Sequence, residues 1–352
     1  MNNLFNSLLD DFFKKNNLDI KNKKFIIGVS TGVDSSVLLD LFIKNKNIDN
    51  NNIIVCHVNH HKREESAIEE EYIKKYCLDN NLKLYVKELY FDEEKDNFQS
   101  LARTKRLEFF KNVIEKENGS FLVLAHHLQD LAETIILRIS RGSSLAGYAG
   151  INECYYNDNY YLIRPLININ KDEIYEYAKS NNITYFEDSS NDSDLYTRNK
   201  IRHNVIPSLV DLNSDILTKF KEFSDVLFNA SSVINDIRDE FIKDNVSFNN
   251  KNFSFSRNVF NSLNSYMQEE VLFELLKPNN LSEKNILELL KIIHSNKSNF
   301  SLIFKNKFEI TLEYDLVLIN YDYKKNNENV SILIKDIGNY PVSDNLSIFV
   351  TN

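Results

Sequence analysis

The sequence is short of the residues that mark several classes of protein: its 352 positions hold no tryptophan, three cysteines, four prolines and seven glycines. Cys56, Cys77 and Cys154 are odd in number and far apart, which argues against a disulfide framework and a Cys-x-x-Cys metal site. No run approaches the roughly 18 apolar residues of a membrane span, and the N-terminus lacks a basic region and a cleavage site. We therefore expect a soluble, cytoplasmic protein with no membrane partner.

Arginine is also scarce, and the chain carries more acidic than basic residues. The net charge of −9 argues against broad, non-specific binding to nucleic acid, although a local basic surface is compatible with it. Only ten of the 42 cationic residues are arginines, and eight of these lie between Arg63 and Arg202. Five of the seven glycines fall at 28–32 and 142–150, which indicates loops with unusual backbone angles or close ligand contact. The chain length predicts about two or three domains.

The stretch from Phe25 to Leu41 reads FIIGVSTGVDSSVLLDL. Its apolar start predicts a buried strand, and Val37 to Phe42 repeats at helical spacing, so Ser30 to Ser36 forms the turn between them. Such a turn presents backbone N–H groups at the positive end of a helix, where a phosphate can bind without a lysine. It is not a Walker loop, because no Gly-Lys-Ser/Thr follows. A generic strand-to-helix turn is the structural alternative.

This turn resembles the pyrophosphatase loop of the N-type ATP pyrophosphatase superfamily, whose pattern is Ser-Gly-Gly-x-Asp-Ser. The resemblance implies an enzyme that splits ATP into AMP and pyrophosphate to adenylate a carbonyl oxygen. Gly32, Asp34 and Ser35 match the pattern. Thr31 replaces its first glycine, which restricts the backbone at that point.

Strands and helices alternate after this loop. We predict strands at 53–58, 82–86 and 121–125 with helices between them, so the fold class is α/β, a parallel Rossmann-like sheet with helices on both faces. Ligands bind at the carboxyl ends of such strands. The polar residues after three strands, at Ser30, at His57 to His61 and at His126-His127, should therefore converge on one rim.

Two carboxylates follow the fourth strand. Asp130 and Glu133 share one face of a helix expected to begin near Leu128, close to its N-terminus. Such a pair can bind Mg²⁺ together with phosphate oxygens, or receive an amino group. The alternatives are a helix-terminal charge for Asp130, buried polar packing for the adjacent histidines, and a zinc site, since five of the seven histidines lie in two clusters.

Five motifs together resemble the tRNA(Ile)-lysidine synthase family. They are His57-Val58-Asn59-His60-His61-Lys62-Arg63-x-x-Ser66, Ala125-His126-His127-x-x-Asp130-x-x-Glu133-Thr134, Arg164-Pro165-Leu166, Glu187-Asp188-x-x-Asn191, and Arg198-Asn199-x-Ile201-Arg202 with Pro207. Each motif is weak by itself, whereas five in the family's order are specific. Lys62 and Gln129 depart from the residues usual in the family, Leu and Asp.

The resemblance implies an ATP-dependent ligase. Such enzymes adenylate the C2 oxygen of the wobble cytidine in the isoleucine tRNA with a CAU anticodon and release pyrophosphate. The ε-amine of free lysine then attacks C2 and expels AMP, which gives lysidine and changes the tRNA from methionine to isoleucine identity. ATP and Mg²⁺ are the implied cofactors, the tRNA and lysine are the partners, and a homodimer is left open.

The resemblance, together with the positive charge and hydrogen-bond donors that the leaving groups need, gives candidate roles to residues of this sequence. Those expected to act in catalysis are Asp34, Arg106, His126, Asp130 and Glu133. Those expected to bind ATP are Ser30, Thr31, Gly32, Val33, Asp34, Ser35, His57 and Arg103. Those expected to contact tRNA are Arg141, Arg198, Asn199 and Arg202, and Mg²⁺ is assigned to Asp34 and Asp130. Exposed cationic stripes are the alternative for Arg103 with Arg106, and a domain-joining helix for Arg198 to His203.

The rest of the chain predicts further domains. Residues 141–151 have the composition of a mobile loop, 160–163 predict a fifth strand, and 171–180 a helix. Long helices are predicted at 209–242, 258–276 and 283–294, and β-strands from 300 onward, with a break at Lys324 to Glu328. We expect a catalytic domain at 1–208, a helical tRNA-binding domain at 209–298, and a β-rich region at 299–352, shorter than in longer family members.

Two rival functions carry their own signals. A related pyrophosphatase, such as a tRNA thiolase or an amidotransferase, would keep the first loop. Thiolases generally need paired cysteines and amidotransferases a glutaminase, and neither is visible. A non-catalytic tRNA-binding protein would bind tRNA without turning over ATP, and the intact Asp34, Asp130 and Glu133 argue against it.

Overall fold

The computed structural model describes residues 2–61, 65–90, 98–157, 159–187, 197–322, 338–343 and 346–350. Three stretches singled out in the sequence lie outside these segments: Lys62-Arg63, Asp188 to Asn191, and the predicted break at Lys324 to Glu328. The chain forms two compact units, Met1–Ser231 and Ser232–Asn352, and each is described by itself. None of the helices in the described segments combines the length and the hydrophobicity that a bilayer crossing requires.

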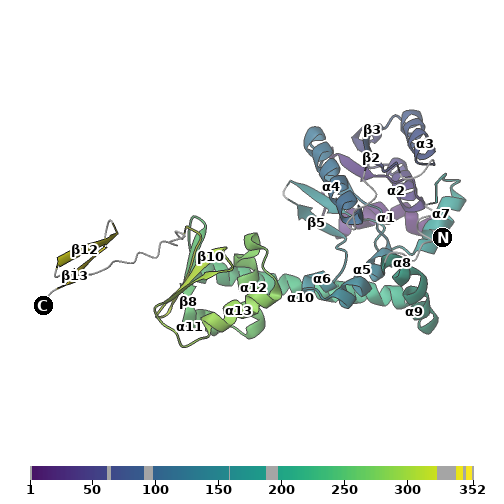
Figure 1. The fold of residues 1–352 in the computed structure, drawn as a ribbon. Coiled ribbons are helices and arrows are strands. Elements are labelled where there is room, and N and C mark those ends of the chain that lie inside the picture. The colour runs from purple at the N-terminus through teal and green to yellow at the C-terminus, as the bar shows by residue number, and fades with distance from the viewer. Residues whose placement is uncertain are drawn as a thin grey trace. The chain divides into compact units, whose positions relative to one another are not determined.

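The first unit is built on a six-stranded sheet in the order β3-β2-β1-β4-β6-β5 (Figure 1). The strands are β1 (Phe25–Gly28), β2 (Ile53–Asn59), β3 (Lys83–Glu88), β4 (Phe121–Val123), β5 (Cys154–Asn157) and β6 (Tyr160–Ile163). Five strands run parallel, which confirms the predicted sheet. β5 was not predicted and pairs antiparallel to β6 at the edge. Its short Cys-Tyr-Tyr-Asn sequence has no apolar run to signal a strand.

Alternate side chains of each strand enter two cores, one on each face of the sheet. Phe25 and Ile27 pack on one face with the helices α1 (Asn2–Lys15), α2 (Val33–Lys44), α3 (Glu65–Asp79) and α7 (Lys171–Ser180). Ile26 packs on the other face with α4 (Phe98–Glu117), which Figure 1 shows across the sheet from α2. The predicted arrangement of helices on both faces is therefore confirmed.

After β4 the chain forms α5 (Leu128–Arg141) and α6 (Leu145–Tyr148), and after α7 it forms α8 (Thr197–Lys200), a π-helical turn (Ile201–Val205) and α9 (Ile206–Leu212). Apolar side chains of α5, the π-helical turn and α9 pack together in one cluster. The prediction of a loop at 141–151 is wrong at Leu145–Tyr148, which form the short helix α6. Ser144 caps this helix, because its hydroxyl accepts a hydrogen bond from Gly147 N. The helix predicted at 209–242 is interrupted. Asn213 is extended, its side chain accepts from Asp215 N, and α10 (Ile216–Asn245) begins afterwards.

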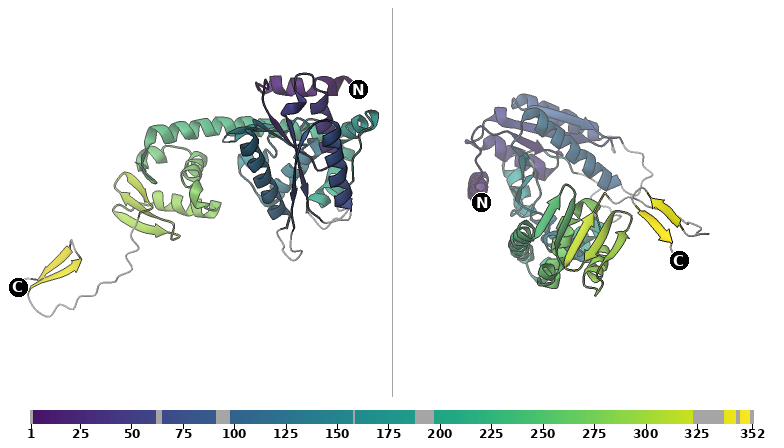
Figure 2. Two further views of the ribbon diagram at one scale, coloured as in Figure 1. Left: turned by 90° about the horizontal axis from the view of Figure 1, so that it is seen from above. Right: turned by 90° about the vertical axis from the view of Figure 1, so that its left-hand side faces the viewer.

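The second unit contains a five-stranded antiparallel sheet, β7-β8-β11-β10-β9, visible in both views of Figure 2. Its strands are β7 (Val246–Asn249), β8 (Asn252–Ser256), β9 (Phe300–Phe304), β10 (Phe308–Glu313) and β11 (Leu316–Asn320). The β7–β8 hairpin was not predicted. Because β8 pairs with β11, the segments assigned to a helical domain and to a β-rich region meet in one sheet.

Helices complete this unit around a single core. They are α11 (Arg257–Asn261), α12 (Ser265–Leu275) and α13 (Glu283–Ile293). The helix predicted at 258–276 is divided in two, because the side chain of Asn264 accepts a hydrogen bond from Met267 N and starts a new helix. Two further strands, β12 (Gly338–Ser343) and β13 (Leu346–Val350), pair with each other.

Candidate active site

The loop between β1 and α2 has a closed hydrogen-bonded geometry. The hydroxyl of Ser35 accepts from Ser30 N at 3.1 Å and donates to the carbonyl of Gly32 at 3.0 Å. Gly32 has an ordinary φ of −70°, whereas Thr31 has a left-handed φ of +63°. The left-handed conformation, which glycine adopts most easily, is therefore found at Thr31, the position where the family pattern has glycine. The loop forms the turn even though threonine stands there.

Thr31 is held in this conformation by its surroundings. Its side chain is fully buried, and its hydroxyl lies 3.3 Å from Oε2 of Glu69 on α3. The carbonyl of Thr31 accepts from Phe186 N at 3.0 Å and from the hydroxyl of Ser36 at 3.4 Å. Partners from two distant segments thus fix one strained residue, a pattern often found at functional loops.

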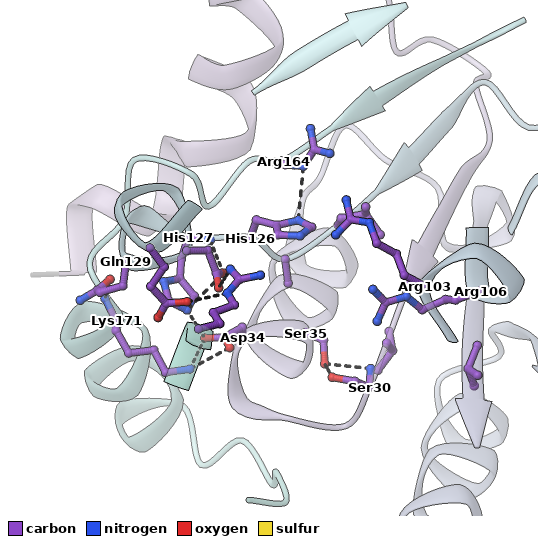
Figure 3. A pocket seen from close by; sticks show the side chains of 18 of the residues that line it. Ser30, Asp34, Ser35, Arg103, Arg106, His126, His127, Gln129, Arg164 and Lys171 are labelled. Carbon is purple, nitrogen blue, oxygen red and sulfur yellow. Dashed lines mark hydrogen bonds and ion pairs between the residues drawn. The ribbon is translucent and has the colours of Figure 1, made fainter. Parts of the chain in front are cut away.

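Asp34, in the first turn of α2, binds a lysine that the sequence did not single out. Nζ of Lys171 lies 2.6 Å and 2.7 Å from the two carboxylate oxygens of Asp34 (Figure 3). Lys171 is the first residue of α7, and its backbone N–H donates to Oε1 of Gln129 at 2.9 Å. The amide of Gln129 also donates to the side chain of Asn170, so it joins the N-termini of α5 and α7.

The two carboxylates of α5 are paired with arginines that follow α7 in the chain. Glu133 is fully buried and accepts from Nε of Arg198 at 2.7 Å and from Nε of Arg202 at 2.6 Å. Asp130 accepts from Nη2 of Arg198 at 2.9 Å. Burial alone would raise the pKa of Asp130, but attraction to His127 and Arg198 outweighs it and holds the pKa below its usual value. Asp130 is therefore ionised at neutral pH.

The adjacent histidines have different partners. Nδ1 of His126 accepts from Nε of Arg164 at 3.3 Å, so the neutral ring carries its proton on Nε2. Burial lowers the pKa of His126 well below its usual value, which keeps the ring neutral at pH 7. His127 is also buried, with Nε2 between Asp130, at 3.4 Å, and Asp34, at 3.8 Å. His127 was not among the predicted site residues.

His57 and two arginines of α4 complete the polar lining. Nδ1 of His57 donates to the carbonyl of Val29 at 2.9 Å, which leaves Nε2 as an acceptor, and burial lowers the pKa of this histidine. Burial and the neighbouring charge of Arg103 lower the pKa of Arg106. Within the segments that the structure describes, neither guanidinium has a carboxylate partner. The pair is therefore suited to bind an anion.

These groups surround one cavity of about 1120 Å³. The predicted convergence of three strand ends is confirmed, because Ser30, His57 and His126 all line it. The other predicted residues that line it are Asp34, Ser35, Arg103, Arg106, Asp130, Glu133, Arg198 and Arg202. Thr31 and Val33 belong to the loop, but they are buried and do not line the cavity, and Arg141 is exposed at the end of α5. Gly32 and Asn199 do not line the cavity.

Lys171 and His127 also line the cavity, together with Gln129, which the sequence had marked only as a departure from the family. The signal for Lys171 was a cation at the first position of a helix, where the helix dipole disfavours positive charge. The signal for His127 was its place next to His126 after a strand. Neither signal is specific without the fold.

The carboxylates satisfy part of what Mg²⁺ requires. Mg²⁺ usually binds one or two carboxylates, with substrate phosphates and water as the remaining ligands. Asp34 and Asp130 both line the cavity, on either side of His127, and fit this donor set once their cationic partners are exchanged. Among the described residues, no group of three or more His, Cys, Asp or Glu side chains is arranged to hold a metal by itself.

The parallel sheet, the loop after β1 and the cavity at the carboxyl ends of the strands define a PP-loop ATP pyrophosphatase. Residues 1–209 match the family model of the PP-loop domain. A solved U34-tRNA thiolase from Methanococcus maripaludis has the same fold, with a TM-score of 0.51 and 22% identity over 59% of this chain and 72% of that chain. This likeness concerns the fold alone.

Curated relatives narrow the class. A tRNA(Ile)-lysidine synthase from Staphylococcus epidermidis is 32% identical over 310 residues, which are 85% of this chain and 71% of that protein. One from Staphylococcus aureus is 31% identical over 90% of this chain and 75% of that protein. One from Enterococcus faecalis is 39% identical over 56% of this chain and 43% of that protein. The chain belongs to the tRNA(Ile)-lysidine synthase family.

Proposed function

We propose that this protein ligates free lysine to C2 of the wobble cytidine in the CAU-anticodon isoleucine tRNA and cleaves ATP to AMP and pyrophosphate. The observation that carries the proposal is the meeting, in one cavity, of a pyrophosphate loop and the acidic pair Asp130 and Glu133. Relatives with this activity in their names match 85% to 90% of the chain. If the substrates are tRNA and free lysine, the proposed reaction belongs to the cytoplasm.

The first step needs groups that stabilise negative charge. The C2 oxygen of cytidine attacks the α-phosphate of ATP, and the bond to pyrophosphate breaks. The loop from Ser30 to Ser35, at the N-terminus of α2, would hold the leaving pyrophosphate, and Arg103 with Arg106 would supply two cations. The Nε2–H group of His126 would donate a hydrogen bond to a phosphate oxygen, because the ring is neutral and its Nδ1 already accepts a hydrogen bond from Arg164.

The second step needs a site for the amino group of lysine. The ionised carboxylate of Asp130, with Glu133 beside it, would attract the ammonium of the incoming lysine. The ammonium must first release a proton to water; the free amine then forms the C–N bond at C2, the bond from C2 to the oxygen of AMP breaks, and a second proton leaves the nitrogen. Asp34 and Asp130 would hold Mg²⁺, which supplies positive charge at the phosphates when bound. The guanidinium groups of Arg198 and Arg202 already engage both α5 carboxylates, so they would act as a strut beneath this subsite.

Contacts to the tRNA are proposed for residues around the cavity. Arg141 is exposed and free to meet a phosphate of the tRNA backbone. Arg198 and Arg202 are each 36% exposed, so their outer faces can also reach the tRNA while their Nε atoms bind Glu133. Asn199 lies between them on α8. The two arginines would then have both a positioning role and a binding role.

The test measures incorporation of radiolabelled lysine into a CAU-anticodon isoleucine tRNA transcript, together with pyrophosphate release from ATP and Mg²⁺. We expect incorporation that requires ATP and is lost in Asp34→Ala. Asp211→Ala, an exposed aspartate of α9, is the matched control and should retain activity. A transcript with a GAU anticodon should remain unmodified.

Tight tRNA binding without lysine incorporation would contradict the proposal. Replacing lysine with sulfide or ammonia in the same assay would then identify a different nucleophile. Absence of pyrophosphate release with every nucleophile would instead leave a tRNA-binding protein without this chemistry.

A further inference from the structure

The ion pair of Asp34 and Lys171 joins the pyrophosphate loop to a helix 137 residues further along the chain. The two residues have side-chain exposures of 27% and 26%, and both line the cavity. Figure 3 shows the side chain of Lys171 extending from the side of Gln129 toward Asp34. A lysine therefore stands at the edge of a phosphate loop whose own sequence has none.

The position of Lys171 is unfavourable for α7 itself. A cation in the first turn of a helix opposes the helix dipole. The same turn contains Asp172 and Glu173, but Glu173 caps the backbone N–H of Asn170 at 2.8 Å, and Lys171 reaches past both of them to Asp34. Helix stability alone therefore does not account for a lysine here, whereas a demand for positive charge at the loop does.

The backbone of Lys171 is fixed by contacts that do not involve its ammonium. Gln129 accepts from Lys171 N and donates to Asn170, so the start of the lysine side chain is anchored to α5. The four-carbon stem retains its rotatable bonds. The ring of Tyr175 lies beside the ammonium, with Nζ 5.1 Å from its centroid. A small rotation of the stem can move the ammonium from Asp34 to a neighbouring anion.

We propose that Lys171 is the phosphate-binding lysine of this loop, held by Asp34 in the free protein and exchanged to the phosphates of ATP when ATP binds with its metal. The inference deepens the proposed function and rests on ATP binding in this cavity. The exchange leaves no charge unpaired, because the metal takes the place of the ammonium at Asp34 while the phosphates replace Asp34 at Lys171. Metal binding and nucleotide binding are then coupled, and the free protein binds the metal weakly.

The test measures two affinities with opposite expected changes. Free Mn²⁺ is followed by electron paramagnetic resonance during titration of the nucleotide-free protein, and binding of α,β-methylene-ATP with Mg²⁺ is followed by calorimetry. In Lys171→Met we expect Mn²⁺ to bind about tenfold more tightly, because Asp34 is released. The nucleotide should bind about 10- to 100-fold more weakly, as expected for the loss of a charged hydrogen bond.

Three further variants make the result specific. Lys179→Met removes an exposed lysine from the last turn of the same helix and should change neither affinity. Lys171→Arg keeps the charge and should restore most of the nucleotide affinity. Asp34→Asn in the Lys171→Met background should abolish the gain in Mn²⁺ binding. Circular dichroism and thermal unfolding confirm that each variant is folded.

If Lys171→Met weakens both affinities, or changes neither, the pair is a structural ion pair and the inference is overturned. Neither titration contains tRNA or lysine, so the result does not depend on the ligase reaction. Opposite shifts without lysine incorporation in the wild-type assay would uphold this inference and reject the proposed function. Incorporation without the opposite shifts would do the reverse.

Discussion

Oε1 of Glu133 lies 2.6 Å from Nε of Arg202, at the contact between α5 and the π-helical turn that follows α8. Arg198 binds the other carboxylate oxygen at 2.7 Å, so one fully buried carboxylate holds two guanidinium groups. π-Helical turns are uncommon and often occur at functional sites. This contact fixes the segment that closes one side of the cavity onto the helix that carries Asp130.

Replacing Glu133 should therefore destabilise the first unit. Loss of one partner of a buried ion pair typically costs about 3–5 kcal/mol. Because each arginine is about one-third exposed to water, we expect about 2 kcal/mol for Glu133→Ala, or a Tm lower by roughly 4–8 °C. Thermal unfolding measures the change. Glu108→Ala, at an exposed position of α4, is the control, and its free energy of unfolding should stay within about 0.5 kcal/mol of wild type. Equal losses of stability in the two variants would show that the contacts of Glu133 with the arginines do not stabilise the unit.

Thr31 gives a prediction about backbone strain. Thr31→Ala keeps the left-handed φ of +63°, and with it the backbone strain of the wild type, and it loses the hydroxyl contact with Glu69, so it should be less stable than wild type. Thr31→Gly loses the same contact but relieves a strain of about 1 kcal/mol. The glycine variant should therefore be more stable than the alanine variant by about 1 kcal/mol in urea unfolding. Equal stability of the two would show that the loop relaxes and that the positive φ is not retained.

The location of the site could be predicted because it depends on local sequence and on a general rule of parallel sheets. The run from Phe25 to Ser36 specifies strand, turn and helix within 12 residues. Once the strands alternate with helices, their carboxyl ends must lie at one edge, which brings Ser30, His57 and His126 together. No long-range information was needed for this step.

The partners within the site could not be predicted, because they come from distant segments. Nothing near Asp34 indicates Lys171, and nothing near Glu133 indicates Arg198 and Arg202, since each pairing depends on how α7 and α8 pack. The β7–β8 hairpin illustrates the same limit. Phe253 and Phe255 alternate as in a strand, but β8 is stabilised by pairing with β11, about 60 residues later.

Glu117 should make stability depend on pH in the acidic range. It accepts from Nζ of Lys83 at 2.6 Å and from the hydroxyl of Tyr85, and these bonds lower the pKa of Glu117 from 4.5 to about 2. A depressed pKa in the folded state means that the stabilisation is present above pH 4.5 and is lost as the pH falls toward 2. The difference in unfolding free energy between wild type and Glu117→Gln should shrink across this window.

Urea unfolding at a series of pH values measures this difference. Glu115→Gln is the matched control, because Glu115 is exposed on the same helix, and its difference from wild type should remain flat. A constant difference for Glu117→Gln between pH 4.5 and pH 2 would show that the contacts with Lys83 and Tyr85 do not favour the ionised carboxylate.

Gln129 should influence ATP binding through Lys171, without touching the nucleotide. Gln129→Met removes both hydrogen bonds to the start of α7, and we expect about two- to tenfold weaker binding of α,β-methylene-ATP. Gln129→Glu keeps the acceptor for Lys171 N and should bind the nucleotide within about twofold of wild type. Calorimetry measures both affinities.

The Lys171→Met background separates positioning from general destabilisation. If Gln129 acts only by positioning the ammonium of Lys171, Gln129→Met should have no further effect once that ammonium is absent. The double variant should then bind the nucleotide no more weakly than Lys171→Met alone. Additive losses in the two variants would mean that Gln129 supports the cavity by another route. The departure from the family's usual aspartate would then be unrelated to the lysine.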